Sequence, residues 1–294
     1  MQRNYITMIN EVASRIIDEA LNEDAVDFTG KIPPGDHSSL ACIPQHKEGQ
    51  AHLLCKAEGV LAGVALAEVI CQKVDSGIVF EKLMEDGALI KKGDIAFVVR
   101  GEVKSILRAE RVLLNFMQRM SGIATNTSHY VQRVSHTSAK ILDTRKTTPG
   151  LRYFEKWAVR IGGGHNHRYG LYDMIMLKDN HIDFCGGITK AIQAVVKYQE
   201  EHQLHLPVEV ETRTLRDVEE VLQTGNVTRI MFDNFSPELM VQAVKLVNRA
   251  FETEASGGIN LDTVARYAET GVDYISVGAL THSSGSLDLS LKAF

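Results

Sequence analysis

The sequence predicts an α/β protein whose second half forms a parallel barrel, and three observations favour this class. The chain of 294 residues is 44% hydrophobic, which is enough to bury a large core and to form two domains. After about residue 140, strands alternate with helices, which implies right-handed βαβ units and a parallel sheet. Polar side chains follow nearly every predicted strand, and this arrangement suits a barrel better than an open sheet with one crevice.

The first half of the chain combines helices with short strands. Its predicted elements are a helix over 8–22, strands over 51–56 and 78–83, a helix over 62–74 between them, and a meander of short strands over 86–103. A long helical pattern follows over 104–138, and we expect it to break at Ser121 and Gly122. These elements predict an α+β layer.

Six strands and four helices alternate in the second half. The predicted strands cover residues 141–144, 172–177, 208–212, 229–233, 251–255 and 274–277. The predicted helices cover residues 188–202, 215–224, 237–250 and 261–270. Six strands are slightly too few for a closed eight-stranded barrel, so an open doubly wound sheet competes with a small barrel.

The composition excludes several classes of protein. A formal net charge of -5 and a pI near 6.1 argue against general nucleic-acid binding. The first residues lack the charged and then apolar pattern of a secretion signal, and the most apolar run, over 59–71, is too short to cross a bilayer. The four cysteines show no CxxC spacing. We therefore expect a soluble, cytoplasmic protein that binds neither nucleic acid nor membranes.

Cations are concentrated between residues 142 and 181, although the chain as a whole is acidic. Positive charge focused in a cleft attracts anions. Arg145 and Lys146 directly follow one predicted strand and Lys178 follows the next, so we expect them at the mouth of an anion site. Other cations in this window have a spacing that can face water on a predicted helix. This interpretation applies to Arg152, Lys156 and Arg160.

The segment GGGHNHR, over residues 162–168, has two competing interpretations. His165 and His167 are two residues apart, so on an extended segment both could face a metal ion. However, Arg168 and Lys178 would place positive charges beside that ion. Anion recognition is favoured, because the three glycines allow backbone N–H groups to come close to a ligand.

Two carboxylates end neighbouring predicted strands. Glu211 and Asp233 could pair with nearby lysines, or they could hold Mg²⁺, which typically takes one or two carboxylates together with substrate phosphates. The two interpretations are compatible, since lysine can occupy the carboxylates until a metal binds. We expect Glu209, on the same strand as Glu211, to point to the other face.

Glycine loops follow the last two predicted strands. Gly257 and Gly258 follow one strand and Gly278 follows the next, each just before a helix, where backbone donors can form a phosphate cradle. The combined features predict a ligand with a phosphate, a metal-bound polyphosphate and a further anion. Phosphoribosyl pyrophosphate together with an acidic co-substrate satisfies all three requirements.

Seven motifs occur in order along the second half of the chain: DTRKTTPGLR, GGGHNHR, KDNH, VEVET, FDNF, EASGGI and SVGALTHS. They resemble the quinolinate phosphoribosyltransferase family, also called carboxylating nicotinate-nucleotide pyrophosphorylases. The upstream runs KAEGVLAG and AERVLLNFMQRMSGIAT are similar to the first domain of that family, whereas residues 22–44 match it only loosely. The resemblance implies an N-terminal open-faced α/β sandwich, over 1–118 with 283–294, and an incomplete, seven-stranded α/β barrel over 119–282.

The same resemblance implies an activity. It is the transfer of phosphoribosyl from phosphoribosyl pyrophosphate to quinolinate with decarboxylation, which gives nicotinate mononucleotide, pyrophosphate and CO₂ in de novo NAD biosynthesis. The resemblance also implies a homodimer in which the first domain of one subunit completes the barrel of the other. Arg111 matches the arginine that reaches across this interface.

The resemblance implies roles for individual residues. Arg145, His167, Arg168 and Lys178 match positions that hold the pyridine dicarboxylate, with Thr147 also among the substrate-binding residues. Lys146, Glu211 and Asp233 match positions at the pyrophosphate and Mg²⁺, and together with Lys178 they form the expected catalytic set. Ser256, Gly257, Gly258 and Gly278 match the site of the 5′-phosphate, with His282 close by. His165 lies outside the Asn-His-Arg element of the family.

Three alternative functions remain open at this point. A barrel lyase could use Lys178 or Lys146 as a Schiff base, provided that the amine is uncharged. A nicotinate phosphoribosyltransferase would not decarboxylate its substrate, and the additional arginine and histidine argue against it. A non-enzymatic sensor of phosphorylated ligands would keep the glycine loops but would not need the paired carboxylates.

Overall fold

The computed structural model describes residues 2–294, with side chains from residue 11 onward, and the chain forms two compact units. The first unit runs to Asn126 and adds Thr147–Gly162 and Ser284–Phe294, and the second comprises Thr127–Lys146 and Gly163–Ser283. The domain division expected from the sequence, 1–118 with 283–294 and 119–282, stays a prediction, because packing in a folded chain does not test which segments fold independently.

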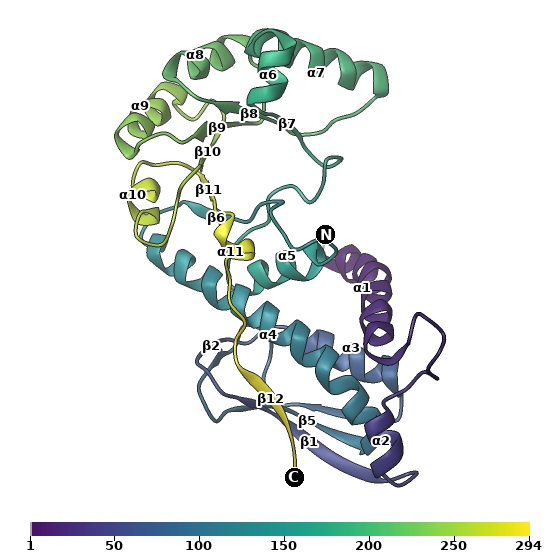
Figure 1. Ribbon diagram of the computed structural model, residues 1–294. Helices are drawn as coiled ribbons and strands as arrows, with labels where there is room; N and C mark the ends of the chain where they lie inside the picture. The colour runs from purple at the N-terminus through teal and green to yellow at the C-terminus, as the bar shows by residue number, and fades with distance from the viewer. Residues whose placement is uncertain (1) are drawn as a thin grey trace. The chain divides into compact units, whose positions relative to one another are not determined.

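The first unit contains a four-stranded antiparallel sheet with the order β12-β1-β5-β3 (Figure 1). Its strands are β1 (Glu48–Cys55), β3 (Val79–Lys82), β5 (Ile95–Glu102) and β12 (Leu289–Ala293). The short strands β2 (Gly59–Val60) and β4 (Leu89–Ile90) pair separately. The predicted strands at 51–56 and 78–83 are confirmed. Strand β12 was not predicted, and its pairing with β1 brings the end of the chain back to the first sheet.

Helices of the first unit are mostly where the apolar spacing predicts them. They are α1 (Gln2–Ala25), α2 (His37–Cys42), α3 (Val64–Val74), α5 (Arg152–Ile161) and the first part of α4 (Val103–Val134). In α1, Ala13, Ile17 and Leu21 are buried at intervals of four residues, which is the spacing of one helix face.

The prediction that the cations of α5 face water is wrong for Lys156. Lys156 is only 3% exposed, whereas Arg160 is exposed and Arg152 is half-buried. Helix α5 buries both Glu155 and Lys156 beside the apolar Phe154, so more than one of its faces is covered. The spacing of charges along the sequence cannot reveal this, because it does not show how many neighbours a helix has.

Helix α4 is continuous through Ser121 and Gly122, so the predicted break is wrong. The hydroxyl of Ser121 accepts a hydrogen bond from the N–H of Ala62 at 2.9 Å and donates one to its carbonyl at 3.1 Å. A Cβ atom built at Gly122 would lie 1.8 Å from the carbonyl oxygen of Gly285. The two small residues therefore allow other segments to approach the helix closely.

The second unit contains a six-stranded parallel sheet with the order β6-β11-β10-β9-β8-β7. Its strands are β6 (Lys140–Leu142), β7 (Ile175–Leu177), β8 (Val208–Thr212), β9 (Arg229–Asp233), β10 (Glu252–Ser256) and β11 (Tyr274–Ser276), and all six were predicted within three residues. Strands β6 and β7 follow one another in the chain but form opposite edges of the sheet. The sheet is therefore an incomplete barrel, and an isolated parallel bridge between Leu142 and His165 extends it beyond β6.

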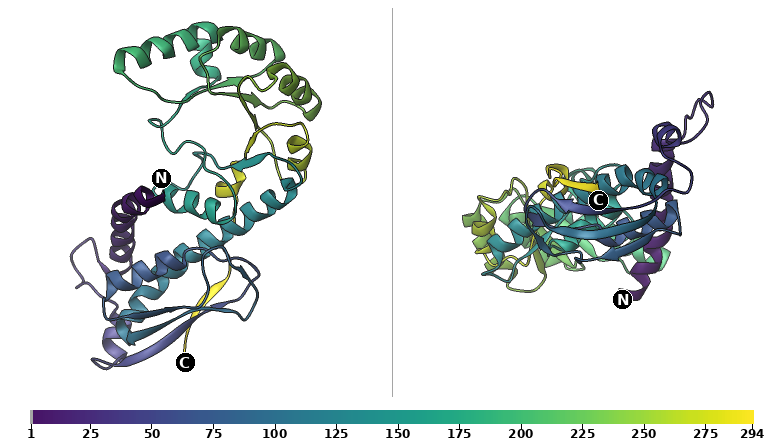
Figure 2. Two further views of the ribbon diagram at one scale, coloured as in Figure 1. Left: turned by 180° about the vertical axis from the view of Figure 1, so that it is seen from behind. Right: turned by 90° about the horizontal axis from the view of Figure 1, so that it is seen from below.

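Helices cover the outer side of this sheet. Figures 1 and 2 show α7 (Ile188–His202), α8 (Leu215–Thr224) and α9 (Pro237–Val247) on the same side of the curved strands. The remaining helices are α6 (Asp179–Cys185), α10 (Val264–Ala268) and α11 (Ala279–His282). Within the part of the chain that the structure describes, no helix combines the length and the apolar character needed to cross a membrane.

We expect the substitution Gly122→Ala to destabilise the protein, although alanine is usually the better helix former. The added methyl group would collide with the backbone at Gly285, and overpacking of this kind costs about 3 kcal/mol. Urea denaturation measures this change. The matched control is Gly285→Ala, whose Cβ would meet no other atom within 4 Å. Equal stability of the two variants would show that the close approach does not constrain the helix.

Candidate active site

Most of the predicted site residues gather at one edge of the parallel sheet. Because all six strands run in the same direction, their carboxyl ends meet at this edge, which is where α/β barrels place their active sites. The residues at or next to these ends are Arg145 and Lys146 after β6, Lys178 after β7, Glu211 in β8, Asp233 in β9, Ser256 in β10 and Gly278 after β11.

Two arginines lie close enough together to repel each other. Burial lowers the pKa of Arg168, and the positive charge of Arg145 lowers it further. Arg168 is half-buried, and its Nη1 donates a hydrogen bond to the carbonyl of Met174 at 3.2 Å. A pair of partly desolvated guanidinium groups is well suited to a carboxylate ligand, which each can bind with two parallel hydrogen bonds.

Asp143 joins the loop after β6 to the segment GGGHNHR. The carboxylate of Asp143 is fully buried and accepts hydrogen bonds from the backbone N–H of His167, at 2.9 Å, and from the side-chain amide of Asn166. Asp143 therefore fixes the positions from which both arginines project. We did not single out this residue from the sequence, although it begins the motif DTRKTTPGLR.

His167 lies against two buried carboxylates. Its Nε2 is 3.0 Å from Oε2 of Glu209 and 3.3 Å from Oε2 of Glu254. The prediction that Glu209 points away from the face of Glu211 is wrong, because residues two apart on a strand share one face. The His167 ring and both carboxylates are almost completely buried.

Burial and charge act in opposite directions on this cluster. Burial alone would lower the pKa of His167, but hydrogen bonds and charge from Glu209 and Glu254 outweigh it and raise the pKa to about 9. Burial, assisted by the charge of Glu254, raises the pKa of Glu209 to about 7. Among the described residues, these three form the group that could offer one ligand atom each to a metal ion.

A second pair of carboxylates lies at the carboxyl edge itself. The Nζ of Lys178 is 3.5 Å from Oε2 of Glu211. Burial raises the pKa of Glu211, Lys178 opposes this shift, and the negative charge of Asp233 adds to it. Two carboxylates within electrostatic reach of each other, one of them paired with lysine, provide the hard oxygen ligands that Mg²⁺ prefers.

Close backbone approaches surround the predicted phosphate loops. Gly257 has a φ of +93°, and a Cβ atom there would lie 2.3 Å from Oδ1 of Asn234. A Cβ atom at Gly278 would lie 3.0 Å from Cδ of Lys146 and 3.1 Å from Nε2 of His282. Glycine at both positions therefore allows a cation, an imidazole and backbone donors to approach one another.

Comparisons with known proteins agree with this geometry. Residues 36–121 match the N-terminal domain, and residues 123–292 the C-terminal domain, of the family model quinolinate phosphoribosyl transferase. The chain belongs to the quinolinate phosphoribosyl transferase family. The loosely matching residues 22–44 lie largely before the first matched residue.

Individual relatives of the family are similar over almost the whole chain. Quinolinate phosphoribosyltransferase [decarboxylating] 1b of Nicotiana tabacum is 49% identical over 94% of this chain and 81% of the relative. A probable nicotinate-nucleotide pyrophosphorylase [carboxylating] of Bacillus subtilis is 41% identical, over 90% of each chain. The crystal structure of NadC from Streptococcus pyogenes superimposes with a TM-score of 0.88 at 40% identity, over 95% of each chain.

Two of the residues implied by the family resemblance belong to the first unit. Arg111 is exposed on α4, and the hydroxyl of Thr147 accepts a hydrogen bond from Nε of Arg152 at 3.1 Å. Their roles in binding substrate stay predictions. The sequence offered one signal for the buried residues that we missed, since Asp143 and Glu254 lie inside the family motifs, as does Glu209, whose direction we predicted wrongly.

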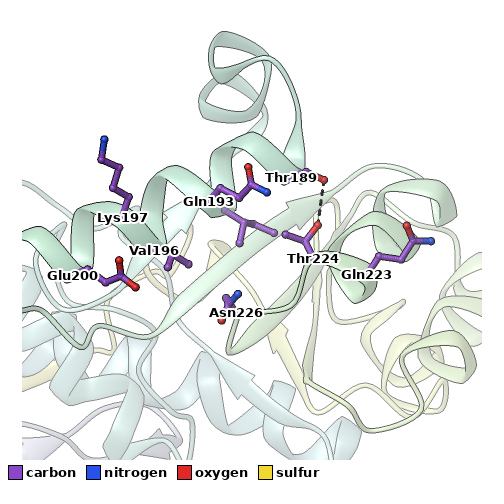
Figure 3. Close-up of a pocket in the computed structure, with 9 residues that line it drawn as sticks. Thr189, Gln193, Val196, Lys197, Glu200, Gln223, Thr224 and Asn226 are labelled. Atoms are coloured by element: carbon purple, nitrogen blue, oxygen red, sulfur yellow. Dashed lines mark hydrogen bonds between the residues drawn. The ribbon is translucent and has the colours of Figure 1, made fainter.

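A separate pocket lies on the outer face of the second unit. Figure 3 shows its lining by residues of α7 and the end of α8, among them Thr189, Lys197 and Thr224. Its volume is about 520 Å³. None of the predicted site residues lines this pocket, so we do not connect it with the chemistry at the carboxyl edge.

We expect the substitution Gly257→Ala to weaken the binding of a phosphate monoester such as ribose 5-phosphate by at least roughly tenfold. The methyl group would displace Asn234, which forms one wall of the loop. Calorimetric titration measures this loss. The control Gly271→Ala has a similar φ of +90° but meets only an ordinary contact, at 3.7 Å. If both variants bound the ester equally, crowding against Asn234 would not affect the phosphate site.

Proposed function

We propose that the protein transfers phosphoribosyl from phosphoribosyl pyrophosphate to quinolinate and decarboxylates the product, giving nicotinate mononucleotide, pyrophosphate and CO₂ in de novo NAD biosynthesis. Membership of the family supports this reaction, as do the names of relatives that include the word decarboxylating. The observation that carries the proposal is the set of cations that follows the carboxyl ends of β6 and β7, Arg145, Lys146 and Lys178, with Arg168 near enough to Arg145 for their charges to interact. Such a set suits a doubly acidic pyridine.

In the first step, the pyridine nitrogen attacks the anomeric carbon of the sugar as the bond to pyrophosphate breaks. The transition state has oxocarbenium character, and negative charge develops on the leaving oxygen. Lys146, beside Gly278, stabilises that charge, and such preorganised electrostatic contributions are usually the largest in catalysis. The arginines orient the ring, and orientation can contribute roughly 7–11 kcal/mol.

In the second step, the carboxylate next to the ring nitrogen leaves as CO₂. The carbon–carbon bond breaks and its electron pair stays on the ring carbon, where the positive charge of the quaternised nitrogen stabilises it. That carbon then takes up a proton. Neither step needs a nucleophile from the protein, so the side chains act by holding charges and fixing orientation.

The carboxylates Glu211 and Asp233 are suited to hold Mg²⁺. Their charges interact, as the raised pKa of Glu211 indicates, and Lys178 supplies a counter-charge at 3.5 Å. When bound, Mg²⁺ would neutralise charge on the pyrophosphate group. The same ion pair disfavours a Schiff-base lyase, because a lysine next to a carboxylate is in the opposite environment to the one that an amine nucleophile needs.

The proposal includes a homodimer in which Arg111 of one subunit reaches the substrate of the other. Its exposed position on α4 is compatible with this role. We keep the cytoplasm as the expected location, although related enzymes of Nicotiana tabacum and Arabidopsis thaliana are named mitochondrial and chloroplastic.

Release of labelled CO₂ tests the reaction directly. We expect quinolinate labelled in the carboxylate next to nitrogen to release CO₂ only when phosphoribosyl pyrophosphate and Mg²⁺ are both present. Removal of the metal with a chelator should stop the release, and added Mg²⁺ should restore it. If nicotinate replaced quinolinate as the better acceptor, or if turnover were absent, the proposed reaction would be wrong.

Mixing of two inactive variants tests the contribution of Arg111. We expect Arg111→Ala and Arg145→Ala to be inactive alone, and their mixture to recover about 25% of wild-type activity, since half of randomly assembled two-fold dimers would contain one intact site. Activity is measured after subunit exchange. A mixture that stayed inactive despite exchange would place Arg111 in the site of its own subunit.

A further inference from the structure

Both ring nitrogens of His167 have polar neighbours inside the protein. Nε2 lies 3.0 Å from a carboxylate oxygen of Glu209 and 3.3 Å from one of Glu254, and Nδ1 lies 2.7 Å from the backbone N–H of Arg168, which donates to it when the ring is neutral. The side chain of His167 is only 4% exposed. The ring thus connects two buried carboxylates to the main chain at the residue that carries one of the two anion-binding arginines.

Glu254 also belongs to a longer series of ion pairs. Its Oε2 accepts a hydrogen bond from Nη1 of Arg229 at 2.8 Å. Arg229 also donates to Glu252, through Nη2 at 3.0 Å and Nε at 3.2 Å, and lies 4.0 Å from the centre of the Tyr274 ring. The series therefore runs from the first residues of β9 and β10 to the segment that ends at Arg168.

This segment needs fixed contacts because its backbone has unusual freedom. It begins with three glycines, of which Gly163 has a φ of +87°. Asp143 anchors the backbone N–H of His167, and the pair Glu209 and Glu254 anchors its ring.

We propose that Glu209 and Glu254 are positioning residues of the anion site: they fix the His167 ring, and through it the main chain at Arg168, so that Arg168 stays beside Arg145. In this arrangement the ring of His167 links the two carboxylates to the main chain at Arg168. The identity of the anion, quinolinate, rests on the proposed function.

The same three side chains could instead hold a metal ion, but the contacts of Glu254 disfavour this. The oxygen of Glu254 nearest to His167 already accepts a hydrogen bond from Arg229. A metal ion bound to that oxygen would lie next to the guanidinium group of Arg229, which would repel it.

The test compares Glu254→Gln and Glu209→Gln with the control Glu252→Gln. Glu252 binds the same arginine but does not contact His167, and its side chain is 43% exposed. We expect the first two variants to raise the KM for quinolinate by at least roughly tenfold, as misplaced binding groups do, with little change in the KM for phosphoribosyl pyrophosphate. The control should change both constants much less, because Arg229 keeps its hydrogen bond to Glu254.

A double-variant comparison separates positioning from general stability. His167→Gln should give the same selective loss, and adding Glu254→Gln to it should cause little further loss, because both changes break one connection. Independent, additive losses would overturn the proposal, as would equal losses for both substrates. A metal ion bound in stoichiometric amount to the purified protein and absent from Glu254→Gln would also overturn it.

Two results distinguish failure of the positioning role from failure of the proposed reaction. Wild-type protein that releases CO₂ from quinolinate, with an unchanged KM in the glutamine variants, would refute only the positioning role. If wild-type protein showed no turnover, calorimetric binding of quinolinate to the same variants would still test it. Should a variant fail to fold, as judged from its thermal unfolding, the remaining two provide the comparison.

Discussion

The candidate site of the second unit depends on holding Arg145 and Arg168 near each other. Arg145 follows β6 and Arg168 ends the segment GGGHNHR, and burial together with the positive charge of Arg145 lowers the pKa of Arg168. The negative charges of Glu209 and Asp173 act on this pKa in the opposite direction. Asp143 holds the segment through the backbone of His167, and in our proposal the buried pair Glu209 and Glu254 holds it through the ring.

The buried carboxylates are therefore better explained by the site than by stability. A buried ion pair is weak evidence of a stabilising contribution, since desolvation offsets much of the attraction. Glu209 and Glu254 lie together away from water, with His167 within 3.3 Å of both and Arg229 2.8 Å from Glu254. Glu209 and Glu254 precede Glu211 and Ser256 on strands β8 and β10, so they lie further from the carboxyl edge. The same two strands therefore carry both the groups at the edge and the buried carboxylates.

Small residues allow distant segments to pack closely at two places in the chain. Gly122 and Ser121 lie inside an unbroken helix, where they make room for the backbone of other segments. Gly257 and Gly278 do the same at the carboxyl edge, for Asn234 and for Lys146 with His282. In each case the constraint is a neighbouring segment that is distant in the sequence. A local rule, such as glycine as a helix breaker, is therefore wrong for Gly122.

The sequence by itself determined the alternation of strands and helices, the parallel sheet, and the residues at the carboxyl ends of its strands. These features depend on local spacing and on the fact that parallel strands end at one edge. The family resemblance already placed residues 283–294 with the first domain. The tertiary structure alone decided that β12 pairs with β1, that Lys156 is buried, and that His167 lies against Glu209 and Glu254. Each of these depends on which distant segments come into contact, and spacing along one chain carries no information about such contacts.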